Sequence, residues 1–301
     1  MKNMNKYENC LLCPRKCGIN RRTGQTGVCG VSSEIKVARA ALHYWEEPCI
    51  SGKKGSGAVF FSGCSLHCVF CQNREISDGK AGKVISKERL SDIFIELVDK
   101  GANNINLVTP GQYIPDIVWA VNDAKSRGMK LPIIYNTSGY ENVTELKQLE
   151  GIVDVYLPDF KYMDSTLSAM YSRAKDYPSV AKQALSEMVR QQPDVVIDDA
   201  TGLIQKGVIV RQLLLPGHVN DAKAVLKYLY DTYHDHVYIS MMSQFTPIAL
   251  KDYPEINRTV TRREYERLVD YALKIGITNA FIQEGDVAKD SFIPAFDCEG
   301  V

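Results

Sequence analysis

The chain has 301 residues, of which 36 are basic and 36 are acidic. This length suffices for one large α/β domain or two smaller ones, and the balanced charge does not indicate a nucleic-acid partner. No stretch of about 18 apolar residues predicts a membrane span, and residues 1–8 lack the apolar core of a secretory signal. We therefore expect a cytoplasmic protein whose nine cysteines serve metal or redox chemistry rather than disulfides.

The first 54 residues form a cysteine-rich segment, which we expect to bind metal ahead of a core domain at residues 55–301. Cys10, Cys13, Cys17 and Cys29 follow the spacing C-x2-C-x3-C-x11-C. Four thiolates so close in sequence can close a tetrahedral zinc site or hold an iron–sulfur cluster. A segment with so few apolar residues would need a metal to fold alone. The spacing leaves both metals open, and four unrelated thiols are the alternative.

A second cysteine motif follows the apolar run 58–61, which predicts a buried strand. Cys64, Cys68 and Cys71 have the spacing C-x3-C-x2-C. A [4Fe–4S] cluster normally takes four thiolates, so a loop with three leaves one iron open to a small molecule. A zinc knuckle or three buried thiols are the alternatives, but no second cysteine pair follows, as zinc sites usually require. The motif therefore predicts a [4Fe–4S] cluster with one open position.

From residue 55 onward, predicted strands alternate with predicted helices, as in βαβ units with a parallel sheet. Apolar stripes predict helices around 90–98, 117–124, 143–149, 181–189, 222–230 and 265–273. Apolar runs predict further strands at 104–108, 131–135, 153–157, 208–215, 237–241 and 281–283. Such units curve into a partial barrel or lie as an open doubly wound sheet. Both arrangements bind ligands at the carboxyl ends of the strands.

The motif of Cys64, Cys68 and Cys71, with the run 55–63 before it and Gln72-Asn73 after it, resembles the signature of the radical S-adenosylmethionine (SAM) enzymes. It is most similar to relatives of the pyruvate formate-lyase activating enzyme. The resemblance implies an α/β fold, a partial (β/α)6 barrel with a cysteine-rich N-terminal extension. It also implies that the three cysteines hold a [4Fe–4S] cluster that binds SAM, and they are our candidate catalytic residues.

The resemblance further implies contacts with SAM from the segments that follow the predicted strands. Phe70 would lie near the adenine or shield the cluster from water, and Asn136 and Ser138 would meet the ribose. The alternative for the last two is a turn that tolerates positive φ. Arg211 would approach the SAM carboxylate, as a bidentate partner.

Two other pairs complete the candidate SAM-binding site. Many family members carry Gly-Gly-Glu where this chain has Thr109-Pro110-Gly111-Gln112, so Thr109, Gln112 or backbone carbonyls would replace the missing carboxylate. Asp159 and Lys161 resemble the Asp-x-Lys pair of the activating enzymes. Residues two apart on a strand share one face, and the alternative is a surface ion pair, which contributes little stability.

The resemblance implies reductive cleavage of SAM to a 5′-deoxyadenosyl radical, which abstracts hydrogen from an unidentified small molecule, peptide or RNA. One alternative is an activase that installs a glycyl radical on a partner enzyme. The other, from a different class, is a non-catalytic zinc or iron–sulfur scaffold. The expected partners are an electron donor such as flavodoxin or ferredoxin, and either a glycyl radical enzyme or a small molecule. Neither a membrane nor nucleic acid is indicated.

Overall fold

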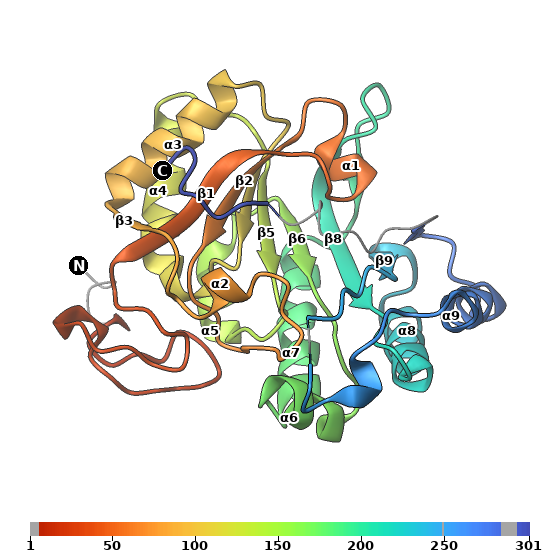
Figure 1. Cartoon of the computed structure of the whole chain (residues 1–301). Coiled ribbons are helices and arrows are strands. Elements are labelled where there is room, and N and C mark those ends of the chain that lie inside the picture. Colours follow the sequence, from red (N-terminus) through yellow and green to blue (C-terminus); the bar gives the residue numbers. More distant parts are fainter. Residues whose placement is uncertain (1–5, 249, 284–293) are drawn as a thin grey trace.

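A ten-stranded sheet runs through the centre of the molecule in this computed structural model, which describes residues 6–248, 250–283 and 294–301 (Figure 1). The order along the sheet is β10-β9-β8-β6-β5-β4-β2-β1-β3, with β7 paired to β8 beside this path. The strands are β1 (Ile35–His43), β2 (Ser56–Phe61), β3 (Lys83–Ile85), β4 (Ile105–Val108), β5 (Ile133–Thr137), β6 (Val155–Pro158), β7 (Val196–Ile197), β8 (Ile204–Leu213), β9 (Tyr238–Met242) and β10 (Ala280–Ile282).

The part of the sheet from β2 to β10 is parallel. Every residue of β2, β4 and β6 is buried, as expected of parallel strands covered on both faces. The α-helices are α1 (Pro48–Ser51), α2 (Arg74–Ser77), α3 (Lys87–Asp99), α4 (Ile114–Ser126), α5 (Val143–Leu146), α6 (Ser165–Ser172), α7 (Tyr177–Gln191), α8 (Val219–Tyr233) and α9 (Arg262–Ile275). Short 3-10 turns lie at Arg21–Thr23, Gly111–Tyr113, Lys147–Leu149, His234–His236 and Pro254–Ile256.

The predicted alternation of strand and helix is confirmed. Six units follow one another as β2–α3, β4–α4, β5–α5, β6–α7, β8–α8 and β9–α9, and β10 comes last. Helices α3 and α9 begin three residues before the apolar stripes that predict them. Their starts are set by caps: Ser86 accepts from the Arg89 amide on α3, and Thr261 and Glu264 form a capping box on α9. Strands β3 and β10 end the path, and no pairing between them is found among the described residues. The sheet is therefore mixed and largely parallel, and in the described part of the chain it does not close into a barrel.

Strand β1 was not predicted, although it lies within the first 54 residues. It pairs antiparallel with both β2 and β3 and so extends the parallel sheet at its edge. Its register shifts between Val37 and Arg39, and such a bulge interrupts the alternation by which strands are recognised. The division at residue 54 stays a prediction, but the sheet itself begins before it.

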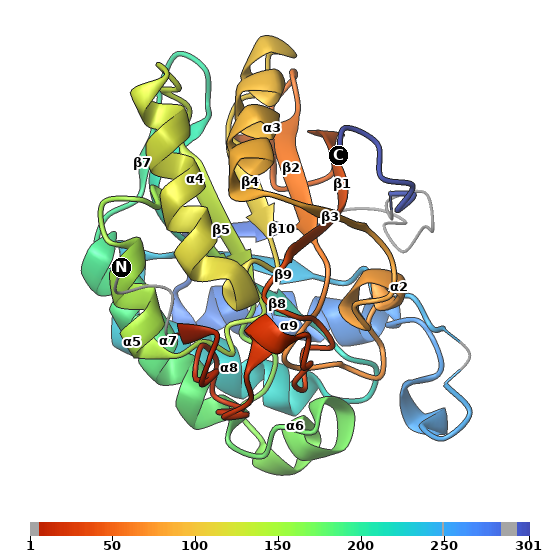
Figure 2. The same cartoon turned by 90° about the vertical axis from the view of Figure 1, so that its left-hand side faces the viewer.

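The segment before β1 lies at the carboxyl ends of the parallel strands. In Figures 1 and 2 its red trace lies at the end of the molecule toward which the arrowheads of β5, β6 and β8 point. A small apolar cluster of Tyr7, Cys10 and Leu12 packs within it. This position brings the N-terminal cysteines to the side of the sheet where ligands bind in parallel folds. No helix in the described part of the chain combines the length and the apolar character needed to cross a bilayer.

Candidate active site

The loop after β2 carries Cys64, Cys68 and Cys71 to the carboxyl end of that strand. Gly63 opens the loop at φ 92°, and a Cβ there would lie 2.8 Å from the backbone oxygen of Cys29. Only glycine tolerates both conditions, so this position fixes the loop against the N-terminal segment.

Two hydrogen-bond donors face the sulfurs of the loop. The Leu66 amide donates to the Cys64 Sγ at 3.4 Å, and the Ser172 hydroxyl of α6 donates to the Cys68 Sγ at 3.0 Å. Burial raises the pKa of Cys64 and Cys68, and raises that of Cys71 to about 12. Since metals bind thiolates, loading the site must displace these protons. Donors aimed at sulfur favour the thiolate form.

The three loop cysteines line one cavity of about 590 Å³. The structure brings most of the predicted SAM-binding residues to its wall, namely Phe70, Thr109, Asn136, Ser138, Asp159, Lys161 and Arg211. They come from the ends of β2, β4, β5, β6 and β8. Thus side chains far apart in sequence converge at one end of the sheet, as the parallel topology predicts.

Gln112 is the predicted site residue that the structure does not bring into this cavity. Its amide nitrogen donates to the backbone oxygens of Ser62, Gly63 and Thr109 at 2.9, 3.0 and 2.8 Å. The side chain is buried and therefore ties the end of β2 to the loop after β4. The reason is local: the carbonyls at the end of β2 lack strand partners and need a donor. Thr109 does line the cavity, with a φ of 57° that is unusual for a β-branched residue.

Asp159 and Lys161 form an ion pair at the cavity wall, with Nζ 2.5 Å from Oδ2. Their side chains are 26% and 13% exposed, so the alternative of a surface pair does not describe them. Burial alone lowers the pKa of Lys161, but the adjacent Asp159 carboxylate raises it above its ordinary value. Lys161 therefore stays a cation, and it lies close enough to Cys68 for its charge to lower the pKa of that thiol.

Arg211 has carboxylate partners that the sequence did not predict. Its Nε lies 2.8 Å from Glu47 Oε1, its Nη2 lies 2.6 Å from Glu47 Oε2, and it also pairs with Glu46. Both glutamates line the cavity, and they are carried by the segment between β1 and α1. Burial raises the pKa of Glu47, but the Arg211 guanidinium lowers it below its ordinary range. No pattern in the sequence marks these glutamates, because they lie more than 160 residues from Arg211.

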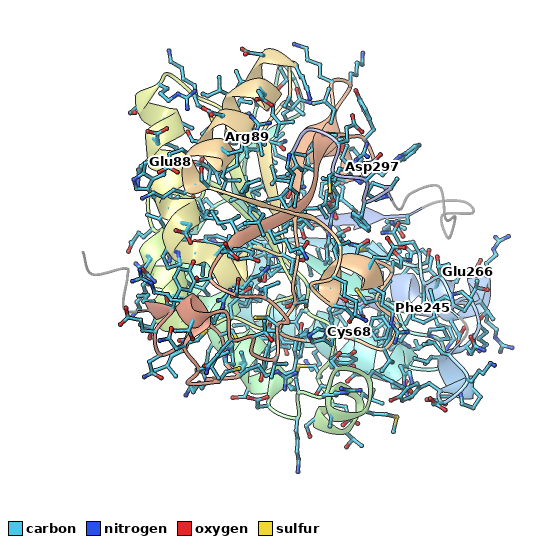
Figure 3. All side chains as sticks on the ribbon, turned by 60° about the vertical axis from the view of Figure 1, so that its left-hand side comes forward. Cys68, Glu88, Arg89, Phe245, Glu266 and Asp297 are labelled. Carbon is cyan, nitrogen blue, oxygen red and sulfur yellow. The ribbon has the colours of Figure 1, made fainter. Side chains whose placement is uncertain are left out.

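Aromatic side chains cover the cavity near the loop. Phe70 packs against Phe245 with ring centroids 5.7 Å apart, and both are buried. Figure 3 shows Cys68 and Phe245 in the same region of the molecule. The ring pair forms an apolar surface beside the loop, and the shielding role of Phe70 stays a prediction.

The residues of the loop fit an iron–sulfur cluster. Three thiols face one cavity, two donors point at their sulfurs, and a permanent cation stands beside them. Among residues 6–248, 250–283 and 294–301, no three His, Cys, Asp or Glu side chains form the compact group that holds a single metal ion.

Residues 51–179 match the family described as a 4Fe-4S single cluster domain. The matched residues contain the whole loop of Cys64, Cys68 and Cys71. The match supports the [4Fe–4S] cluster predicted at this loop.

The chain is also similar to other proteins along most of its length. Uncharacterized protein MJ0674 from Methanocaldococcus jannaschii is 28% identical over 281 residues, which cover 91% of this chain and 77% of the relative. Streptococcus suis SuiB bound to S-adenosylmethionine is 16% identical with a TM-score of 0.49, over 74% of this chain and 48% of SuiB. HydG, a maturase of the [FeFe]-hydrogenase, is 16% identical with a TM-score of 0.46, over 69% of this chain and 46% of HydG. The chain thus spans about half the length of these two structures.

Proposed function

We propose that the protein is a radical SAM enzyme that cleaves SAM reductively and abstracts hydrogen from a substrate held in the cavity. One observation carries this proposal: the three thiols of the 4Fe-4S domain share a single cavity with polar side chains from four further strands. When bound at Cys64, Cys68 and Cys71, the cluster supplies the electron that converts SAM to methionine and a 5′-deoxyadenosyl radical.

The polar wall suits the nucleoside end of SAM. Asn136 and Ser138 stand at the end of β5 with oxygen and nitrogen atoms able to bond ribose hydroxyls. The adjacent backbone is tied down, because the Tyr177 hydroxyl donates to the Ser138 oxygen at 2.9 Å and the Thr109 amide donates to the Asn136 oxygen at 2.9 Å. A rigid turn of this kind holds a ligand in one orientation at low entropic cost.

The charged wall suits the methionyl end of SAM, which carries an ammonium and a carboxylate. Lys161 remains positive. Glu46 and Glu47 carry two negative charges against the one positive charge of Arg211, so this cluster is net negative. These groups offer an anion and a cation to the two ends of an amino acid. Because the Gly-Gly-Glu carboxylate is missing after β4, we assign its role toward the ammonium to Glu46.

Exclusion of water is the remaining demand, because a carbon radical reacts with whatever group lies nearest. Phe70 and Phe245 close the cavity beside the loop, and Leu66 is buried behind it. The substrate C–H bond must then be held next to the radical carbon, where placement rather than acid–base chemistry sets the rate.

Anaerobic reconstitution with iron and sulfide, followed by SAM and dithionite, tests the proposal. We expect 5′-deoxyadenosine from the wild-type protein and none from Cys64→Ala. Cys49→Ala is the matched control, because Cys49 is a buried thiol that packs in a separate apolar cluster. Failure of the wild type to form 5′-deoxyadenosine would leave the scaffold hypothesis in its place.

A glycyl-radical activase is a second candidate, and the Asp159–Lys161 pair favours it, because it resembles the Asp-x-Lys pair of the activating enzymes and lies at the cavity wall. Electron paramagnetic resonance (EPR) on mixtures with candidate partner enzymes tests this reading. A glycyl-radical doublet that requires both SAM and Lys161 supports the activase, whereas 5′-deoxyadenosine formation without any doublet favours a small-molecule or peptide substrate.

A further inference from the structure

The four N-terminal cysteines lie together beside the active-site loop. Cys10, Cys13, Cys17 and Cys29 line a second cavity of about 30 Å³, and Cys64 of the loop lines it too. The backbone folds tightly around them: the Gly18 amide donates to the Cys10 oxygen at 3.0 Å. A spacing of nearly twenty residues therefore closes into one site.

Gly27 has no side chain and so leaves space for the sulfur of Cys17. A Cβ on Gly27 would lie 2.8 Å from the Cys17 Sγ, so a larger residue would push this sulfur away from the cavity. Cys10 and Cys29 are buried, whereas Cys13 and Cys17 are partly exposed.

Arg21 supplies an independent sign that a negative group belongs here. Its side chain is among the largest that are fully buried, at 1% exposure. Its guanidinium donates to the backbone oxygens of Gln112 and Ser32 at 2.8 and 2.5 Å and lies 3.9 Å from the Cys10 Sγ. Within the described residues it has no carboxylate at ion-pair distance. A buried cation is costly unless an anion compensates it.

We propose that Cys10, Cys13, Cys17 and Cys29 ligate a second [4Fe–4S] cluster whose negative charge is compensated by buried Arg21. Zinc takes the same four ligands, but Cys64 of the loop lines the same cavity, and only a redox-active centre could exchange electrons with a cluster on that loop. A four-thiolate cluster carries a net negative charge and takes four cysteines, which matches both the ligand count and the unpaired cation.

The second cluster is placed to relay electrons to the first, and this role rests on the proposed function. Arg15, in the turn between Cys13 and Cys17, donates to the backbone oxygens of Ser65 and Ser172 at 2.8 and 3.1 Å. Ser172 in turn donates to the Cys68 sulfur. A low-potential one-electron donor of the ferredoxin or flavodoxin class is oxidised, and the second cluster is reduced. The same electron then passes to the loop cluster, and no covalent bond changes.

Metal analysis of the reconstituted full-length protein tests the site. We expect about eight iron and eight sulfide per chain, and about four of each in the triple variant Cys64→Ala, Cys68→Ala, Cys71→Ala. The complementary variant Cys10→Ala, Cys13→Ala should retain about four of each at the loop. Cys298→Ala is the matched control, a partly exposed thiol remote in sequence from both sets. About four iron with one zinc in the wild type, or about four iron alone, would overturn the proposal.

These outcomes separate this inference from the proposed function. Eight iron without 5′-deoxyadenosine leaves the second cluster in place and removes the SAM chemistry. Four iron with 5′-deoxyadenosine does the opposite.

The role of Arg21 has its own readout, the midpoint potentials of the two clusters in an EPR-monitored redox titration. Loss of a buried positive charge disfavours the more negative, reduced form, so Arg21→Met should lower one midpoint potential and leave the other unchanged. Arg21→Lys should keep most of the wild-type value. Arg22→Met is the control, because Arg22 is an exposed neighbour paired with Glu8. Equal potentials in Arg21→Met and Arg22→Met would refute the charge compensation.

Discussion

The ion-pair cluster around Arg211 offers a stringent test of how the active-site cavity is built. In Arg211→Met, an apolar chain of similar length replaces the only cation found within ion-pair distance of Glu46 and Glu47 in the described structure. The arginine is 12% exposed, and the two glutamates are 7% and 5% exposed. The hydrogen bond from the Asn106 amide to Glu46, at 2.9 Å, and the hydrogen bond between Ser240 and Glu47 would remain.

The expected loss follows from leaving buried charge without a partner, which costs about 3–5 kcal/mol. At about 2 °C per kcal/mol for a chain of this size, the melting temperature at pH 8 should fall by about 6–10 °C. Arg262→Met is the matched control, because Arg262 and Glu266 form a one-turn helical pair that is 91% and 54% exposed. Figure 3 places Glu266 at the periphery of the molecule. Loss of such a pair costs about 0.5 kcal/mol at most.

The pKa of Glu47 predicts how the difference in melting temperature between the wild type and Arg211→Met changes with pH. In the wild type the folded-state pKa of Glu47 is lowered. Glu47 therefore stabilises the fold at pH values above its ordinary pKa, and this stabilisation is lost as the pH falls through the folded-state pKa. In Arg211→Met the raising effect of burial on the pKa of Glu47 is opposed only by hydrogen bonds from the Glu47 backbone and the Ser240 side chain. We expect burial, the largest of these effects, to raise this pKa above its ordinary value, so stability falls as the pH rises from the ordinary to the folded-state pKa. The difference in melting temperature should therefore grow from pH 5 to pH 8, as measured by circular dichroism. A difference at pH 8 no larger than that of Arg262→Met would refute the reasoning.

Three further predictions concern the loop and its surroundings. Ser172→Ala should keep the iron content but lower the midpoint potential of the loop cluster, because it removes a donor to the Cys68 sulfur; an unchanged potential would contradict this. Gly111→Ala should lower the free energy of unfolding by about 1–3 kcal/mol, since its Cβ would lie 2.8 Å from the Glu141 carboxylate; a neutral urea melt would contradict it. Burial raises the pKa of Glu141 to about 7, so wild-type stability should fall from pH 5 to pH 7.5, and Glu141→Gln should flatten that profile.

The sequence was sufficient for features that depend on neighbours along the chain. The spacing of Cys64, Cys68 and Cys71 places three thiols on one loop whatever the rest of the fold does. The buried stripe of α3, which includes Leu90, Ile93, Phe94 and Leu97, follows from the helical period alone. The alternation of predicted strands and helices then implies a parallel sheet that binds ligands at the carboxyl ends of its strands.

Features that depend on long-range pairing could not be read in this way. Arg211 lies 164 residues from Glu47, and either residue could equally have faced water. Gln112 illustrates the same limit, because its role is set by carbonyls of residues about fifty positions earlier that happen to approach it. Strand β1 was hidden by a bulge, which moves its side chains out of the alternation on which strand prediction depends.

The buried cations of this protein differ in one respect that the sequence conceals. Lys161 has Asp159, and Arg211 has Glu46 and Glu47, so each is compensated by the protein itself. Arg21 is as deeply buried, yet within the described chain it is surrounded by backbone oxygens, aromatic rings and a thiol. A buried positive charge without a carboxylate partner is tolerated when a bound group supplies the compensating negative charge. Four cysteines at the same place supply ligands for a group of that charge, and this is the basis of our proposal that the N-terminal segment holds a second metal centre beside the loop.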